Sequence, residues 1–174
     1  MAAAVVILFS GCRAAVPPDQ VAEPEKMTNE PVAWETFSGA WFEIDYPLDF
    51  EARPSLATSD GSGGFDSVFF HSPDGEVIFY VCSPQWSREA SDFRPVRDAE
   101  RLISTEQQVL TDGTLTVFTI AAEDGTYGRI YEETVQHEGS VRWGTGIHYR
   151  DAKALDDYRG RYVRFKESLN QFSD

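Results

Sequence analysis

The sequence predicts an α+β domain in which an antiparallel sheet of about seven strands carries a C-terminal amphipathic helix. Between residues 41 and 149, short β-rich apolar runs alternate with turn sequences, several of which contain Asp-Gly or Glu-Gly. After residue 150 the apolar side chains recur at spacings of three and four, which is the period of a helix. Because such a helix must bury its apolar stripe, we expect it to pack on the sheet and form an α/β sandwich.

The first predicted elements are a strand over residues 41–46 and a hairpin. In the strand, Phe, Ile and Tyr alternate with acidic residues, and Pro47 ends it because proline lacks a backbone donor. The hairpin has arms over 67–71 and 76–83, which flank the turn sequence Ser-Pro-Asp-Gly. Its second arm is apolar on both faces, which predicts a central strand covered on both sides.

A loop and four further strands follow. Residues 84–99 have a mixed composition with two prolines and predict a loop with one helical turn. The four strands after it are each joined to the next by a short turn that contains glycine, and they cover residues 102–110, 114–122, 129–136 and 141–149.

The last segment carries the most regular pattern in the chain. Its apolar stripe predicts an amphipathic helix and consists of Leu155, Tyr158, Tyr162, Phe165, Leu169 and Phe172. Asp151, or the acidic pair at 156–157, suits the positive end of that helix. The basic residues Arg159, Arg161, Arg164 and Lys166 fall outside the stripe, and a solvated face explains them better than an acidic partner or an anionic membrane.

The N-terminal residues predict targeting to a membrane. Residues 1–11 form a short apolar run, too short to span a bilayer, that ends in small residues before Cys12. This pattern resembles a signal peptide followed by a lipobox, in which Cys12 is lipidated. Residues 12–36 hold four prolines without a helical or strand period and predict a disordered tether. For the first twelve residues, the alternative is a buried N-terminal strand with an incidental cysteine. A single globular domain is expected over 37–174.

Composition limits the possible partners. The chain has 174 residues with a formal charge of -14 and carries no cluster of Lys or Arg, which argues against binding to nucleic acid. It has two cysteines, too few for a disulfide scaffold. Cys82 lies in an apolar run, so we expect it to act as a small buried hydrophobic residue.

Few residues suggest a catalytic or metal site. The three histidines lack the short spacings of zinc ligands, and no cofactor motif is present. Asp60, Ser62 and Asp66 offer oxygens of the kind that calcium prefers, but the EF-hand positions do not match, and a glycine-rich loop is the favoured interpretation. The carboxylates at 132–133 are adjacent on a strand and should point to opposite faces. A Ser/His/Asp triad from distant residues stays open, because triads are defined in space.

An aromatic contact patch is a further hypothesis. Trp86 lies in the loop after the central strand, with Tyr80 and Phe93 near it in sequence. Aromatic side chains are enriched at binding surfaces, so these three residues form a possible binding patch. The alternative is a small satellite core under the loop.

Two short motifs resemble the PsbP-like fold family. The opening of the domain matches as Phe37-Ser-Gly-x-Trp41-Phe-x-Ile-x-Tyr-Pro47-x-x-Phe50, and the ending as Ser168-Leu-x-x-Phe172. The resemblance implies an antiparallel sheet flanked by helices. Its members include extrinsic photosystem subunits and small bacterial lipoproteins of undefined role. They share no catalytic residues, so none is assigned.

Three functional hypotheses follow. The first is a non-enzymatic protein, lipid-anchored in the bacterial cell envelope, that binds or helps to assemble another envelope component, for which a protein partner is expected. The second is a lipoprotein that binds a small molecule or a metal in a pocket between sheet and helix. The third is an unrecognised hydrolase.

Overall fold

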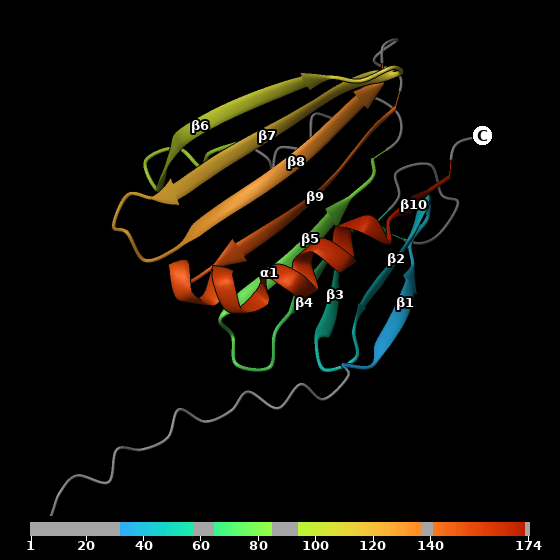
Figure 1. Cartoon of the computed structure of the whole chain (residues 1–174), viewed down its shortest axis with the longest axis horizontal. Coiled ribbons are helices and arrows are strands. Elements are labelled where there is room, and N and C mark those ends of the chain that lie inside the picture. The colour runs from blue at the N-terminus through green and yellow to red at the C-terminus, as the bar shows by residue number, and fades with distance from the viewer. Residues whose placement is uncertain (1–31, 58–64, 85–93, 137–140, 173–174) are drawn as a thin grey trace, which may run out of the picture. The chain divides into compact units, whose positions relative to one another are not determined.

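This computed structural model describes residues 32–57, 65–84, 94–136 and 141–172. These residues form ten strands in two antiparallel sheets, and one helix (Figure 1). The strands are β1 Trp34–Ser38, β2 Phe42–Pro47, β3 Glu51–Ala57, β4 Phe65–His71, β5 Val77–Cys82, β6 Glu100–Val109, β7 Gly113–Ala122, β8 Gly128–Gln136, β9 Arg142–Tyr149 and β10 Asn170–Gln171. The helix α1 spans Ala152–Glu167. It is the only helix among the described residues. It is not long and apolar enough to cross a membrane.

The large sheet has seven strands in the order β3-β4-β5-β9-β8-β7-β6. All four predicted hairpins are present as antiparallel pairs, namely β4–β5, β6–β7, β7–β8 and β8–β9. β5 lies between β4 and β9, and almost all of its residues are buried, as its two-sided apolar composition predicts. The predicted α+β class with a seven-stranded antiparallel sheet is therefore confirmed.

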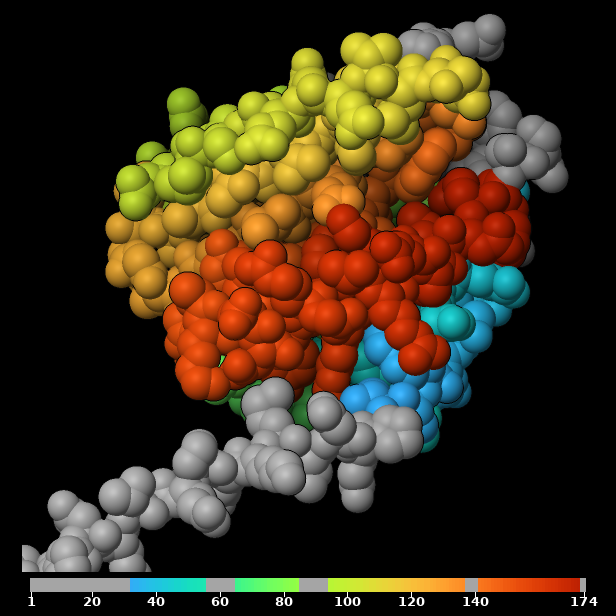
Figure 2. All heavy atoms as spheres, viewed as in Figure 1, coloured from blue at the N-terminus to red at the C-terminus, as the bar shows by residue number. Residues whose placement is uncertain are grey.

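The main core lies between α1 and one side of the large sheet, which we call the helix face. Phe79 of β5 and Phe70 of β4 meet Phe165 of α1 at ring-centroid distances of 5.1 and 5.4 Å. Ile147 of β9 is fully buried in the same cluster. In Figure 2 the atoms of α1 cover part of this side, while β6 and β7 stay at the surface beside the helix.

The other side of the large sheet, which we call the opposite face, carries a second and smaller core. Tyr80 stacks on Phe69 at 4.4 Å and meets Tyr131 edge-on at 5.9 Å. Cys82 is 1% exposed in this cluster, as expected for a small buried hydrophobic residue. Gly146 of β9 makes room for the Tyr131 ring, because a β-carbon at this position would lie 2.2 Å from a ring atom.

α1 is capped as its sequence predicts. Asp151 is the N-cap, and its carboxylate accepts a hydrogen bond of 2.9 Å from the Ala154 N–H. Ser168 is the C-cap, and its hydroxyl oxygen accepts a hydrogen bond from the Asp45 N–H of β2 at 2.9 Å. The end of the helix is thereby tied to the small sheet.

The small sheet, in the order β1-β2-β10, differs from the prediction. The predicted strand at 41–46 lies here and not in the large sheet, where β3 takes the seventh place. β1 begins at Trp34, inside the predicted tether, because residues 34–38 pair with β2. The helix ends at Glu167 instead of continuing through Phe172, because Asn170 and Gln171 pair with β2 as β10.

Candidate functional site

A buried ion pair lies on the opposite face of the large sheet. Arg129 of β8 donates to Glu100 of β6, and their side chains are 8% and 3% exposed. Arg129 also donates to the Tyr131 hydroxyl and to the Arg94 carbonyl, each at 2.9 Å. The carboxylate of Glu100 accepts further hydrogen bonds from the Val96 N–H and the Tyr127 hydroxyl, each at 2.7 Å.

This network holds residues 94–100 against the sheet. Burial acts to raise the pKa of Glu100, but hydrogen bonds from Val96, Arg129 and Tyr127 outweigh it, so that the pKa falls below its ordinary value. The carboxylate is therefore charged at neutral pH and paired with the guanidinium. An ion pair this well surrounded by hydrogen bonds indicates a structural role.

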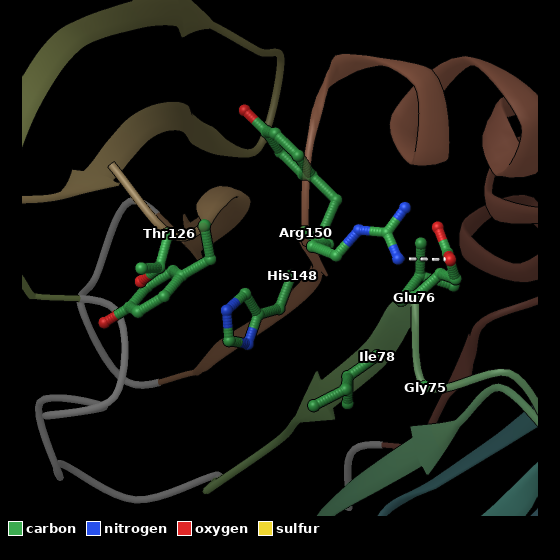
Figure 3. A pocket seen from close by; sticks show the side chains of 9 residues that line it. Gly75, Glu76, Ile78, Thr126, His148 and Arg150 are labelled. Carbon is green, nitrogen blue, oxygen red and sulfur yellow. Dashed lines mark ion pairs between the residues drawn. The ribbon is translucent and has the colours of Figure 1, made fainter. Parts of the chain in front are cut away.

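A pocket of about 220 Å³, which we call the His148 pocket, lies next to this network at the ends of β5 and β9. Figure 3 shows the His148 imidazole in the middle of the pocket and Ile78 beside it, with Thr126 and Arg150 on opposite sides. Arg150 forms an ion pair with Glu76 at 2.5 Å.

The electrostatic surroundings keep His148 neutral. Burial lowers its pKa most, and the charge of Arg129 lowers the pKa further, although Glu100 partly offsets this. The ring of Tyr127 packs edge-on against the imidazole at 4.3 Å. A neutral imidazole can donate from one nitrogen and accept at the other.

A second pocket, which we call the α1 pocket, lies between the end of α1 and the helix face of β7–β9. Its volume is about 250 Å³, and Trp143, Leu115 and Leu169 contribute apolar surface to it. Lys166 of α1 forms an ion pair with Glu132 of β8 at 2.6 Å in its wall. The sequence hypothesis of a pocket between sheet and helix therefore has a location, while its occupation by a ligand stays a prediction.

The third concavity is a groove of about 490 Å³ on the opposite face, across β6, β7 and β8. We call it the β6–β8 groove. Its described lining is mainly hydroxyl and amide side chains, together with one aromatic, one aliphatic and one acidic residue: Thr105, Gln107, Thr114, Thr116, Phe118, Glu133, Val135 and Gln136.

The residues predicted from sequence as a binding patch do not all have a described position. Tyr80 is 2% exposed and belongs to the core of the opposite face, so it offers no contact surface of its own. Trp86 and Phe93 lie outside the described residues, and the patch as a whole stays a prediction. Cys12 also lies outside them, so its lipidation is untested.

Only one of the three predicted oxygen ligands has a described position. Asp60 and Ser62 lie outside the described residues, whereas Asp66 lies on β4, where its carbonyl accepts a hydrogen bond of 2.7 Å from the Ser83 N–H. In the described ranges, no three His, Cys, Asp or Glu residues come together as metal ligands would. Glu132 and Glu133 contact Lys166 and Arg142 from opposite faces of the sheet, as predicted.

Sequence reasoning missed both the buried ion pair and the residues that line the three concavities. Glu100 and Arg129 are 29 positions apart, and the β6–β8 groove draws on three strands. The available signal was the run of threonine and glutamine at alternate positions of two adjacent predicted strands, which fixes a shared face once the strands pair.

Comparison with known proteins identifies the fold. No family model matches the sequence, and no curated protein does. The solution structure of cyanobacterial PsbP (CyanoP) from Synechocystis sp. PCC 6803 matches with a TM-score of 0.53 and 10% identity, over 83% of this chain and 96% of that chain.

Two other solved structures give lower scores. A protein from Bacteroides thetaiotaomicron matches with a TM-score of 0.41 and 15% identity over 81% of this chain and 48% of that chain. The Ran-binding protein Mog1p of Saccharomyces cerevisiae matches with a TM-score of 0.42 and 6% identity over 80% of this chain and 96% of that chain. Identities this low show the fold alone, and on the match to CyanoP the fold of this chain is PsbP-like.

Proposed function

We propose that this chain is a lipid-anchored protein of the bacterial cell envelope that binds an extended segment of another envelope protein and is not an enzyme. The membrane attachment rests on the apolar run before Cys12 and on the proline-rich residues that follow it. The partner binding rests on one structural observation, the exposed edge strand β6.

β6 is one of the two edge strands of the large sheet, opposite the edge formed by β3, and it is ten residues long. Among the described residues, it pairs only with β7. Leu102, Ile103 and Val109 are 48%, 51% and 79% exposed along it. An edge strand of this length with exposed apolar side chains can pair with an extended segment of another chain through its outer backbone groups.

The charge of the chain indicates which segments would bind. A formal charge of -14 repels acidic segments and favours a neutral or basic one. Arg101 and Glu106 lie on β6 itself and give the edge both signs of charge.

A non-enzymatic role is supported by what the polar groups of the pockets already contact. Tyr127 donates to Glu100 at 2.7 Å, and Lys166 donates to Glu132 at 2.6 Å. Arg150 is held by Glu76 and Asp151. Each of these side chains is already paired within the fold.

The experiment is crosslinking from intact envelopes with four forms of the full chain. The wild type should fractionate with membranes and capture one protein, whereas Cys12→Ala should be found in the soluble fraction. Ile103→Lys places a charge on the β6 edge and should reduce capture at least about fivefold, the effect of roughly 1 kcal/mol. Leu48→Lys, at a position 57% exposed outside β6, is the matched control and should capture normally.

Each part of the proposal can fail separately. If Cys12→Ala still fractionates with membranes, the lipid anchor is wrong. If Ile103→Lys and Leu48→Lys capture the partner equally well, β6 is not the binding edge.

The α1 pocket favours a second candidate function, the binding of a small apolar molecule. It combines Trp143 and two leucines with one ion pair, two threonines and the carboxylate of Glu167, and small-molecule sites likewise set a few polar groups beside apolar surface. An uncharged fluorescent apolar probe such as N-phenyl-1-naphthylamine should bind the wild type and bind Leu115→Lys several-fold more weakly. Equal binding by the two would exclude this pocket.

A further inference from the structure

The β6–β8 groove is built from side chains that share one face of three adjacent strands. Thr105 lies opposite Phe118, and Gln107 lies opposite Thr116 in the β6–β7 pairing. Thr116 in turn lies opposite Glu133 in the β7–β8 pairing. The described residues that line the groove all come from these three strands.

The polar groups of the groove both donate and accept hydrogen bonds. The Thr hydroxyls and the Gln amides each have both capacities, so they can pair with a ligand that is rich in hydroxyl groups. Gln107 and Thr116 already approach each other at 3.4 Å, which places their polar atoms side by side on the floor.

The described residues that line the groove carry little net charge. Glu133 is its one charged side chain among the described lining residues, and it forms an ion pair with Arg142 at 3.1 Å. Among those same lining residues none is basic, so the groove lacks what a phosphate or a carboxylate would need. Its chemistry fits an uncharged ligand.

Apolar surface lies between the polar groups. Phe118 and Val135 line the same groove and are partly exposed. A sugar ring presents C–H groups on its faces and hydroxyl groups at its edge, and this combination matches an aromatic ring set among hydroxyls and amides.

The position of the groove argues against a peptide. Its floor is a face of the sheet centred on β7, whose backbone groups are already paired with β6 and β8. A peptide strand could not extend the sheet there, as it could at the outer edge of β6. The three strands span roughly 10 Å across, and residues 114–118 span roughly 13 Å along β7, which leaves space for more than one sugar ring.

We propose that the β6–β8 groove binds an uncharged stretch of an oligosaccharide. Gln107, Thr105 and Thr114 hydrogen-bond the sugar hydroxyls, and Phe118 packs against a ring face. This site is separate from the outer edge of β6 and does not depend on the lipid anchor.

The test is a nuclear magnetic resonance titration of the ¹⁵N-labelled full chain with soluble uncharged tetrasaccharides. Chitotetraose, cellotetraose and maltotetraose are the probes. We expect at least one of them to shift the amide signals of 105–107, 114–118 and 133–136 in a saturable way. Saturable shifts that gather elsewhere, or no saturable shift with any probe, would overturn the proposal.

Paired variants on neighbouring residues distinguish the two faces of the sheet. Gln107→Ala removes an amide that lines the groove and should weaken binding about fivefold, the effect of one lost hydrogen bond. Gln108→Ala changes the next residue, which pairs with Leu115 of the α1 pocket on the helix face, and should bind as the wild type does. Equal weakening by both variants would also overturn the proposal.

A third variant and a competing ligand complete the experiment. Thr114→Val keeps the shape of the side chain, removes its hydroxyl and should weaken binding without changing the fold. If an uncharged extended peptide occupies the groove and the sugars do not, the ligand class is wrong. Because all these measurements use purified protein, they stay independent of the crosslinking result.

Discussion

Replacing Arg129 with methionine tests the account of the buried ion pair. The substitution keeps most of the apolar volume of the side chain but leaves the Glu100 carboxylate, 3% exposed, without its guanidinium. Removing one partner of a buried pair costs about 3–5 kcal/mol, because the remaining charge stays desolvated. Domains of this size are stable by about 5–15 kcal/mol, so the variant should fold but unfold at clearly lower urea concentration.

The measurement is equilibrium urea unfolding at pH 7, followed by tryptophan fluorescence. Arg53→Met is the matched control, because the Arg53–Glu51 ion pair is 55% and 65% exposed and should contribute no measurable stability. The double variant Arg129→Met/Glu100→Gln should be less destabilised than the sum of the single variants, by about 0.5–3 kcal/mol.

The pH dependence gives an independent check with a defined sign. In the wild type the pKa of Glu100 is lowered, so its contribution to stability is present at neutral pH and is lost as the pH falls through that pKa. In Arg129→Met the unpaired buried carboxylate should have a raised pKa, so protonation of Glu100 stabilises the variant and the difference between the two proteins shrinks as the pH falls. A loss under about 1 kcal/mol at pH 7, or a difference that grows in acid, would refute the reasoning.

Three further predictions concern stability. Gly146→Ala should cost about 1–3 kcal/mol in urea unfolding because its β-carbon would overlap the Tyr131 ring, whereas Gly160→Ala, in open space on α1, should stabilise by about 0.5–1 kcal/mol; equal effects would contradict the packing described. Asp151→Ala should cost about 1 kcal/mol and Asp151→Asn much less, as expected of an N-cap; similar losses would point to charge alone. Because the pKa of His148 is lowered, stability should fall as the pH drops from about 6.5 towards that pKa, and His148→Gln should flatten this part of the curve.

Local patterns predicted most of the fold. The turn at 72–75 fixed the β4–β5 hairpin, and the spacing of apolar residues after Asp151 fixed α1. The strands that were missed contain residues that are unusual in strands. Pro54 interrupts β3, which is tolerated because β3 is an edge strand with an irregular register at that point.

The end of the helix shows why tertiary contacts can override a sequence period. Leu169 and Phe172 continue the apolar spacing of α1, yet Ser168 ends the helix and the chain turns into β10. Pairing with β2 decides this, and no window of neighbouring residues contains that information. The candidate sites depend in the same way on register, since Glu100 meets Arg129 only when β6, β7 and β8 are paired.

The small sheet also sets an order of events during synthesis. β2 has β1, from residues 34–38, on one side and β10, from residues 170–171, on the other. A growing chain can therefore form the hairpins of the large sheet early, but it cannot complete this three-stranded sheet until residue 171 has emerged from the ribosome. The core face of β2, with Phe42 and Ile44 fully buried in the finished structure, must wait for α1 as well. Folding of this unit is thus expected to finish late, and removal of the last few residues should affect its first strands most.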